Sequence, residues 1–174
     1  AESGSQYINK KINFVISQSA LEHIEKDTFV IEEITKKLCK NNTPFIQIHM
    51  VPASKCLWLY LWHGYRQYSK KNLSNISNQL KKKINVNTCI IPLGGNNSFW
   101  THLRYITLPD FFKRIILKDK AFKWCNQKKV DEKIIKSVNK ELDCNEENPI
   151  FWAFIISSNK INIKDNLVKN VQTK

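Results

Sequence analysis

Cysteine and histidine are the residues of this chain that could hold a metal ion or form a catalytic pair. Successive cysteines are 17, 33, 36 and 19 residues apart, and there is no Cys-x-x-Cys or His-x-x-x-His pair. A zinc site needs ligands paired closely along the chain, so we expect no metal ion. An odd number of cysteines without a tight framework predicts reduced thiols in an intracellular protein. The residues concerned are Cys39, Cys56, Cys89, Cys125 and Cys144, with His23, His49, His63 and His102.

Phosphate binding and nucleophilic catalysis have equally few candidates. The chain has 4 glycines, and it contains neither a glycine-rich phosphate-binding motif nor a Gly-x-Ser-x-Gly nucleophile motif. The pair Gly94-Gly95, followed by two asparagines, favours a turn, with a small anion-binding loop as the alternative. We therefore expect no catalytic residue and no cofactor. The question of enzymatic activity stays open, with the sequence favouring none.

Positive charge is concentrated in the middle of the chain. The formal net charge is +13, and residues 61–129 hold 14 basic and 2 acidic residues, a net charge of +12. Such a segment attracts polyanions because each neutralised phosphate releases counterions, and a solvated lysine surface is the alternative. The aromatic residues at its start could stack on single-stranded nucleic acid or anchor a protein interface. The candidate nucleic-acid-binding residues are Trp62, Tyr65, Arg66, Tyr68, Lys70, Lys71, Lys81, Lys82, Lys83, Arg104, Lys113 and Arg114.

The apolar pattern predicts alternating strands and helices. Short apolar runs predict strands, and apolar residues three or four apart predict helices. Ser19 and Glu22 form the sequence pattern of a capping box at the start of the first helix. This order predicts an α/β fold, a single layered domain with a mainly parallel central sheet flanked by helices. Strands are expected at 12–16, 45–49, 56–62, 88–93, 99–108 and 150–156, and helices at 20–40, 72–84, 110–117, 120–126 and 130–142.

Length and composition predict one domain. The 174 residues contain no repeat and no linker, so we expect a single α/β domain over residues 1–157. Residues 158–174 are polar and rich in lysine and asparagine, which predicts a flexible tail. No apolar run approaches 18 residues, and residues 1–15 are too polar for a signal peptide. The expected location is intracellular, in the nucleus or the cytoplasm.

The order of elements resembles that of PIN and NYN nuclease domains, in which the first strand leads directly into a helix. The resemblance spans residues 12–156 by element order alone. In that family an Asp at or near the end of the first strand binds a metal ion. The matching stretch here, Val15-Ile16-Ser17-Gln18, has no carboxylate, and Asp110 is the acid of the basic segment that could fill a later position. The resemblance implies a degenerate, non-cleaving domain, a kind that also serves as scaffolding in chromatin-silencing proteins.

Three functions remain, in order of preference. The first is a non-catalytic interaction or scaffolding domain of a larger intracellular, preferably nuclear, protein, with another protein as its partner. The alternative is a domain that binds RNA or single-stranded DNA through residues 61–129. The third is a metal-dependent nuclease whose site the sequence does not reveal. We expect no membrane partner and no small-molecule cofactor.

Overall fold

The computed structural model describes most of the chain and divides it into two compact units. Unit 1 comprises Ala1–Pro52, His63–Ile91 and Trp152–Lys174, and unit 2 comprises Ala53–Trp62 and Pro92–Phe151. We treat each unit by itself. The described residues are 6, 8–9, 11–59, 65–112, 127–141 and 149–161, without the side chains of 57–59 and 110.

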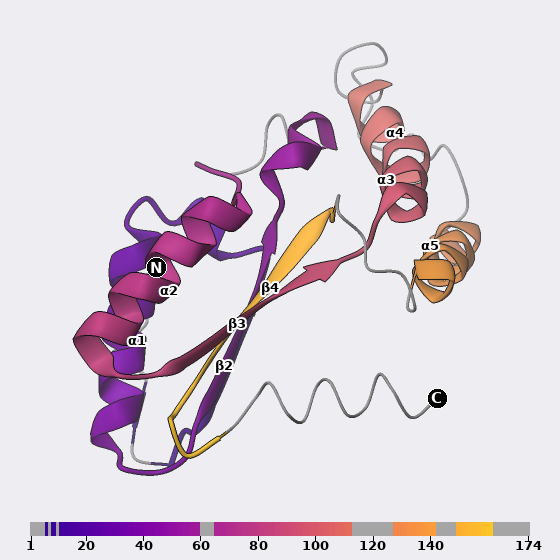
Figure 1. Cartoon of the computed structure of the whole chain (residues 1–174). Coiled ribbons are helices and arrows are strands. Elements are labelled where there is room, and N and C mark those ends of the chain that lie inside the picture. The colour runs from indigo at the N-terminus through magenta and orange to yellow at the C-terminus, as the bar shows by residue number, and fades with distance from the viewer. Residues whose placement is uncertain are drawn as a thin grey trace. The chain divides into compact units, whose positions relative to one another are not determined.

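A four-stranded sheet is the centre of unit 1 (Figure 1), and its strand order is β1-β2-β4-β3. β1 and β2 are parallel, with Phe14 opposite Ile46 and Gln18 opposite Met50. β4 runs antiparallel to its neighbours, since Ser158 N donates to Phe45 O just beyond the opposite ends of β4 and β2. The strands are β1 (Phe14–Gln18), β2 (Ile46–Pro52), β3 (Asn87–Leu93) and β4 (Phe151–Ser157).

The sheet is mixed, so the prediction of a mainly parallel sheet was wrong, although the α/β class is confirmed. The first three strands do run in the same direction, as strand–helix–strand units require. The last strand lies between β2 and β3 in the opposite direction, which leaves β1–β2 as the parallel pair. The position of a strand within a sheet is a non-local property that the order of elements does not specify.

Helices α1 (Asp27–Lys40) and α2 (Lys70–Ile84) lie on the same side of the sheet (Figure 1). Both were predicted from the spacing of their apolar residues. The capping box was wrong, because Ser19 has a φ of 46° and a short 3₁₀ helix, Leu21–His23, separates it from α1. The buried apolar side chains of α1, α2 and the sheet form one core: Leu21, Val30, Ile31, Ile34, Leu38, Phe45, Val51, Tyr68, Leu73, Ile76, Leu80, Val86, Phe154 and Ile156.

Besides the ends of β3 and β4, the described part of unit 2 has helices at two places where strands had been predicted. The segment Ser54–Leu59 is a 3₁₀ helix, so the prediction of a strand at 56–62 was wrong for residues 56–59. Residues 60–62 lie outside the described part. β2 already has β1 and β4 as neighbours, which leaves no place beside it for a further strand. The strand expected at 99–108 was also wrong. That stretch is helical: α3 (Asn96–His102), a π-helical turn (Leu103–Thr107) and α4 (Leu108–Phe111).

The remaining predictions have mixed outcomes. The helix expected at 130–142 is confirmed as α5 (Gln127–Glu141), and the four strands of unit 1 were all predicted within two or three residues of their ends. Residues 113–126 lie outside the described part, including the helix expected at 120–126. The single domain over 1–157 and the flexible tail stay predictions. Within the described residues, none of the helices combines the length and the apolar character that a membrane span needs.

Candidate functional site

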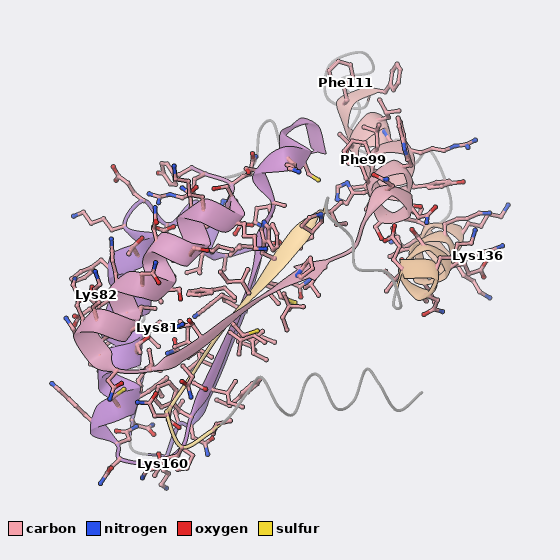
Figure 2. The ribbon with its side chains drawn as sticks, in the orientation of Figure 1. Lys81, Lys82, Phe99, Phe111, Lys136 and Lys160 are labelled. Atoms are coloured by element: carbon pink, nitrogen blue, oxygen red, sulfur yellow. The ribbon has the colours of Figure 1, made fainter. Side chains whose placement is uncertain are left out.

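The lysines of α2 are the part of the predicted nucleic-acid site that the structure brings together. α2 contains no acidic residue, and Ser69 caps it by accepting a hydrogen bond from Asn72 N at 3.1 Å. Apolar residues three or four apart turn one side of α2 to the core, so the opposite side faces solvent. Figure 2 shows Lys81 and Lys82 on this helix. The exposed basic residues of α2 are Lys70, Lys71, Lys81, Lys82 and Lys83.

One of these lysines has an acidic partner. Lys83 Nζ lies 2.8 Å from Glu32 Oε2 on α1. Hydrogen bonds from Lys83 and Lys36 hold the pKa of the Glu32 carboxyl below its ordinary value. Lys71 and Lys82 lie on the opposite side of α2 from the core, with Asn75 and Asn78 between them. The surface most accessible to a polyanion is therefore this stripe of Lys71, Asn75, Asn78 and Lys82.

Tyr68 has a structural role instead of a binding one. Its side chain is 1% exposed, and its hydroxyl donates a hydrogen bond to Asp27 Oδ2. Arg66 Nη1 lies 3.2 Å from Asp27 Oδ1, and Arg66 Nη2 donates to Glu25 O at 3.2 Å. Burial, with the Asp27 carboxylate beside it, raises the pKa of the Tyr68 hydroxyl well above its ordinary value. A ring with no open face cannot stack on a base, so Tyr68 is removed from the predicted site.

The remaining candidate residues are scattered. Tyr65 is 72% exposed, while its backbone N–H donates to Glu22 O. Arg104 belongs to unit 2 and lies over the ring of Tyr105, with 5.7 Å between its Cζ and the ring centroid. The other predicted residues, Trp62, Lys113 and Arg114, lie outside the described residues.

A buried polar network that the sequence did not predict joins β1, β2 and α1. Gln47 and His49 point from β2 toward the helices, and both are buried. Thr35 Oγ1 donates to Ile31 O at 2.7 Å and accepts from Gln47 Nε2 at 2.9 Å. This leaves Gln47 Oε1 facing His49 Nε2 at 3.3 Å.

These hydrogen bonds assign the tautomer of His49. Gln47 Oε1 can only accept, so His49 Nε2 carries the proton and Nδ1 is an acceptor. Ser17 Oγ, 2.8 Å from Nδ1, is therefore the donor. A hydroxyl, an imidazole and an orienting amide form the arrangement of an activated nucleophile. Burial lowers the pKa of His49 to about 4, however, and a 1% exposed imidazole is both a weak base and inaccessible to a substrate. The network instead gives buried polar groups their hydrogen-bond partners.

The side of the sheet opposite α1 and α2 is largely apolar, and its residues on β1 are exposed. Val15, Gln47 and His49 point toward the helices, and side chains alternate along a strand, so their neighbours point to the other side. Phe14 and Ile16 are 53% and 55% exposed. None of the four strands contains a lysine, arginine, aspartate or glutamate. We call this surface the open face; its residues are Phe14, Ile16, Ile46, Ile48, Met50 and Ile155.

The open face continues into an edge of the sheet. β1 is the first strand in the sheet order and has a described strand neighbour on one side only. Ile46 N donates to Asn13 O, and Ser19 N donates to Met50 O at 3.0 Å. Because backbone groups alternate in direction along a strand, the odd-numbered residues of β1 bond to β2. The N–H and C=O groups of Phe14, Ile16 and Gln18 thus point away from β2, and we call them the free edge.

Metal and thiol chemistry can be judged for the described residues. No three His, Cys, Asp or Glu side chains in this part of the chain lie close enough together to hold a metal ion. Cys39, Cys56 and Cys89 are free thiols, and burial raises the pKa of Cys56 to about 11. The two further cysteines, Cys125 and Cys144, lie outside the described residues, so the prediction of five free thiols stays a prediction.

Comparison of the whole chain with models of protein families, with curated proteins and with solved structures gives no match.

Proposed function

We propose that this chain is a non-catalytic interaction domain that binds another protein through the open face. The observation that carries the proposal is the exposure of Phe14 and Ile16 beside Ile46 and Ile48, on the side of the sheet away from α1 and α2. Contiguous apolar surface of this kind on a folded domain is typical of a protein-binding site. An antiparallel or mixed sheet in water usually carries polar residues on its uncovered side.

The buried network supports this proposal by contrast. Hydroxyl, amide and imidazole groups occupy the covered side of β1 and β2, at Ser17, Gln47 and His49. Most apolar residues of the same two strands lie on the uncovered side, while Val15 and Val51 face the core. Apolar side chains that stay in water contribute less to the free energy of unfolding than buried ones do, so a unit that functions alone gains nothing from exposing them. Their exposure is the physical argument for a partner.

The test compares capture of proteins by three forms of the chain. The double variant Phe14→Ser, Ile16→Ser removes the apolar character of β1, and the variant Lys71→Glu, Lys82→Glu reverses charge on α2. We expect the wild type and the α2 variant to capture the same proteins from a nuclease-treated extract, and the β1 variant to lose them. Thermal denaturation controls for folding. Equal capture by all three forms would contradict the proposal.

A second candidate function is polyanion binding by α2, and the absence of any acidic residue from this helix favours it. Contacts of lysine with phosphate are insensitive to sequence and weaken with salt. Binding of single-stranded RNA or DNA should therefore be weak, independent of sequence and strongly dependent on salt. On a single strand, each lost phosphate contact lowers the log–log salt slope by about 0.7.

Fluorescence anisotropy with an oligonucleotide, over a salt series, tests this second function. The variant Lys71→Glu, Lys82→Glu should reduce both affinity and salt slope for every sequence tried. The matched control is Lys36→Glu on α1, where the lysine already lies 2.9 Å from Glu32 and 3.0 Å from Glu33. Unchanged binding by the α2 variant would show that α2 is only a solvated surface. The nuclear location, the larger parent protein and the PIN-like resemblance stay hypotheses beside both functions.

A further inference from the structure

We infer that the partner of the open face adds an extended strand to the free edge of β1, and that this strand carries acidic residues at its end. The inference rests on the proposed function and specifies how the partner binds. Phe14, Ile16 and Gln18 contribute their backbone groups to the free edge, and Phe14 and Ile16 also contribute their side chains to the open face. An added strand would thus continue the sheet while its own apolar residues extend the open face.

β1 lacks the features that usually protect an edge strand. Edge strands in soluble proteins commonly carry lysine, proline or a bulge, which prevents pairing with another chain. The sequence of β1 is Phe-Val-Ile-Ser-Gln, with no charge and no proline. The other edge strand, β3, does contain Pro92. Among the described strands, β1 is therefore the edge suited to accept a partner.

The charge around the start of β1 identifies the chemistry of the added strand. Asn41 Nδ2 donates to Asn9 O at 2.8 Å, and Lys160 Nζ donates to Asn42 O at 3.3 Å, so three segments meet at this end of the sheet. Figure 2 shows Lys160 there. The described residues within 8–13, 37–46 and 157–161 include no aspartate or glutamate, and their exposed lysines include Lys11, Lys40 and Lys160.

This positive end decides between two occupants. A second copy of the chain would have the same net charge of +13, and repulsion would oppose association at low salt. An acidic segment from another protein is attracted instead, and it gains backbone hydrogen bonds along β1 as well. We therefore commit to an extended acidic segment, with alternating apolar residues, of a different protein.

The test uses two synthetic peptides that differ only in the charge at their ends. One is Glu-Glu-Val-Thr-Val-Thr-Val-Glu-Glu, and the other has lysine in place of each glutamate. We expect the glutamate peptide to bind the full chain at least about tenfold more tightly than the lysine peptide, because like charges oppose the second one. Fluorescence anisotropy with labelled peptides gives both affinities.

A pair of variants at one position isolates the backbone contribution. Ile16→Ala removes the side chain and keeps the N–H, whereas Ile16→Pro also removes an N–H that points away from β2. Proline is tolerated on an edge strand when its nitrogen faces outward, so β1–β2 pairing should survive. We expect Ile16→Pro to bind the glutamate peptide about tenfold more weakly than Ile16→Ala, because an added strand loses that hydrogen bond and meets the ring. Circular dichroism checks the fold of both variants.

A measurement on the wild type does not depend on either variant. Bound glutamate peptide should slow hydrogen exchange at the amides of Phe14, Ile16 and Gln18. Equal affinities for the two peptides, equal binding by Ile16→Pro and Ile16→Ala, or unchanged exchange at these amides would overturn strand addition. If capture of proteins still depends on Phe14 and Ile16 in that case, the proposed function stands and the partner binds the open face in another way. If capture of proteins does not depend on Phe14 and Ile16 either, both strand addition and the proposed function are contradicted.

Discussion

Ile16 of β1 lies beside Ile48 of β2 in the parallel register, and both side chains lie on the side of the sheet that α1 and α2 leave uncovered. The next residues along the two strands, Ser17 on β1 and His49 on β2, form a hydrogen bond with each other on the covered side. The two strands therefore present most of their apolar residues outward and several of their polar residues inward, while Val15 and Val51 face the core.

The first prediction concerns the stability cost of changing the open face. Ile16→Ser should lower the free energy of unfolding by less than about 1 kcal/mol, because the side chain is already 55% exposed. Ile31→Ala, at a fully buried position of α1, should cost about 2–5 kcal/mol. Urea unfolding of both variants measures the difference. A cost for Ile16→Ser as large as that for Ile31→Ala would mean that the folded chain itself covers the open face.

The second prediction concerns the two tyrosines at the start of the basic segment. Tyr68→Phe leaves Asp27 without the hydroxyl that donates to Oδ2, and should cost about 1–3 kcal/mol of unfolding free energy. Tyr65→Phe is the matched control, because Tyr65 is exposed, and should change stability by no more than about 0.5 kcal/mol. Chemical denaturation measures both. Equal effects would contradict a structural role for the Tyr68 hydroxyl.

The third prediction is a pH dependence caused by His49. Burial lowers its pKa from 6.5 to about 4, so between these values the unfolded chain binds a proton that the folded chain does not. Stability should therefore be lost as the pH falls from about 6.5 toward 4, with a slope approaching 1.4 kcal/mol per pH unit from this residue. Urea unfolding between these pH values, for the wild type and for His49→Gln, measures this slope.

Comparison of variants separates His49 from the carboxylates that titrate in the same range. His49→Gln should reduce the slope, and because the carboxylates are all retained in this variant, the difference between the two slopes belongs to the imidazole. If His49→Gln retains the full slope, the imidazole is not the group responsible.

The fourth prediction concerns unit 2, where the Glu141 carboxylate of α5 caps the start of α3. It accepts hydrogen bonds from Gly95 N at 2.8 Å, from Ser98 N at 3.0 Å and from the Ser98 hydroxyl. Glu141→Ala leaves these donors without a partner and should cost about 1–3 kcal/mol locally. Amide hydrogen exchange at Gly95 and Ser98 should become faster in Glu141→Ala and stay unchanged in Glu132→Ala, an exposed residue of the same helix. Unchanged exchange in both variants would contradict the cap.

The elements that the sequence predicted are those with a local signal. The apolar spacing of α2, from Leu73 to Ile84, and the β-rich run Thr88–Leu93 need no distant partner to be recognised. The stretch 99–108 contains aromatic and β-branched residues that favour a strand, yet it is helical. Part of the reason is Glu141, which caps α3 from about 40 residues away in the sequence. Because the capping residue is so distant in the sequence, the residues next to α3 do not indicate that a helix begins there.

The candidate surfaces likewise divide into those that local sequence predicts and those that distant contacts decide. The lysines of α2 were recognised from the sequence because charge is local. Tyr68 was assigned to the binding surface because it lies among aromatic and basic residues at the start of the basic segment, and its hydrogen bond to the distant Asp27 accompanies its burial. The open face could not be foreseen, since the runs 12–16 and 45–49 alternate weakly and the covered side is decided by where α1 and α2 pack. The free edge exists because β3 and β4 both lie beyond β2 and neither pairs with β1, which is again a non-local property.

The most direct test of the central claim is hydrogen exchange along β1 in the isolated chain, measured by nuclear magnetic resonance. The register directs the amides of Val15, Ser17 and Ser19 toward β2, and Ser19 N donates to Met50 O. We predict slow exchange at these three amides and fast exchange at Phe14, Ile16 and Gln18. Protection of all six amides would show that the chain already covers its own edge, and would contradict the account of β1 as a site open to a partner.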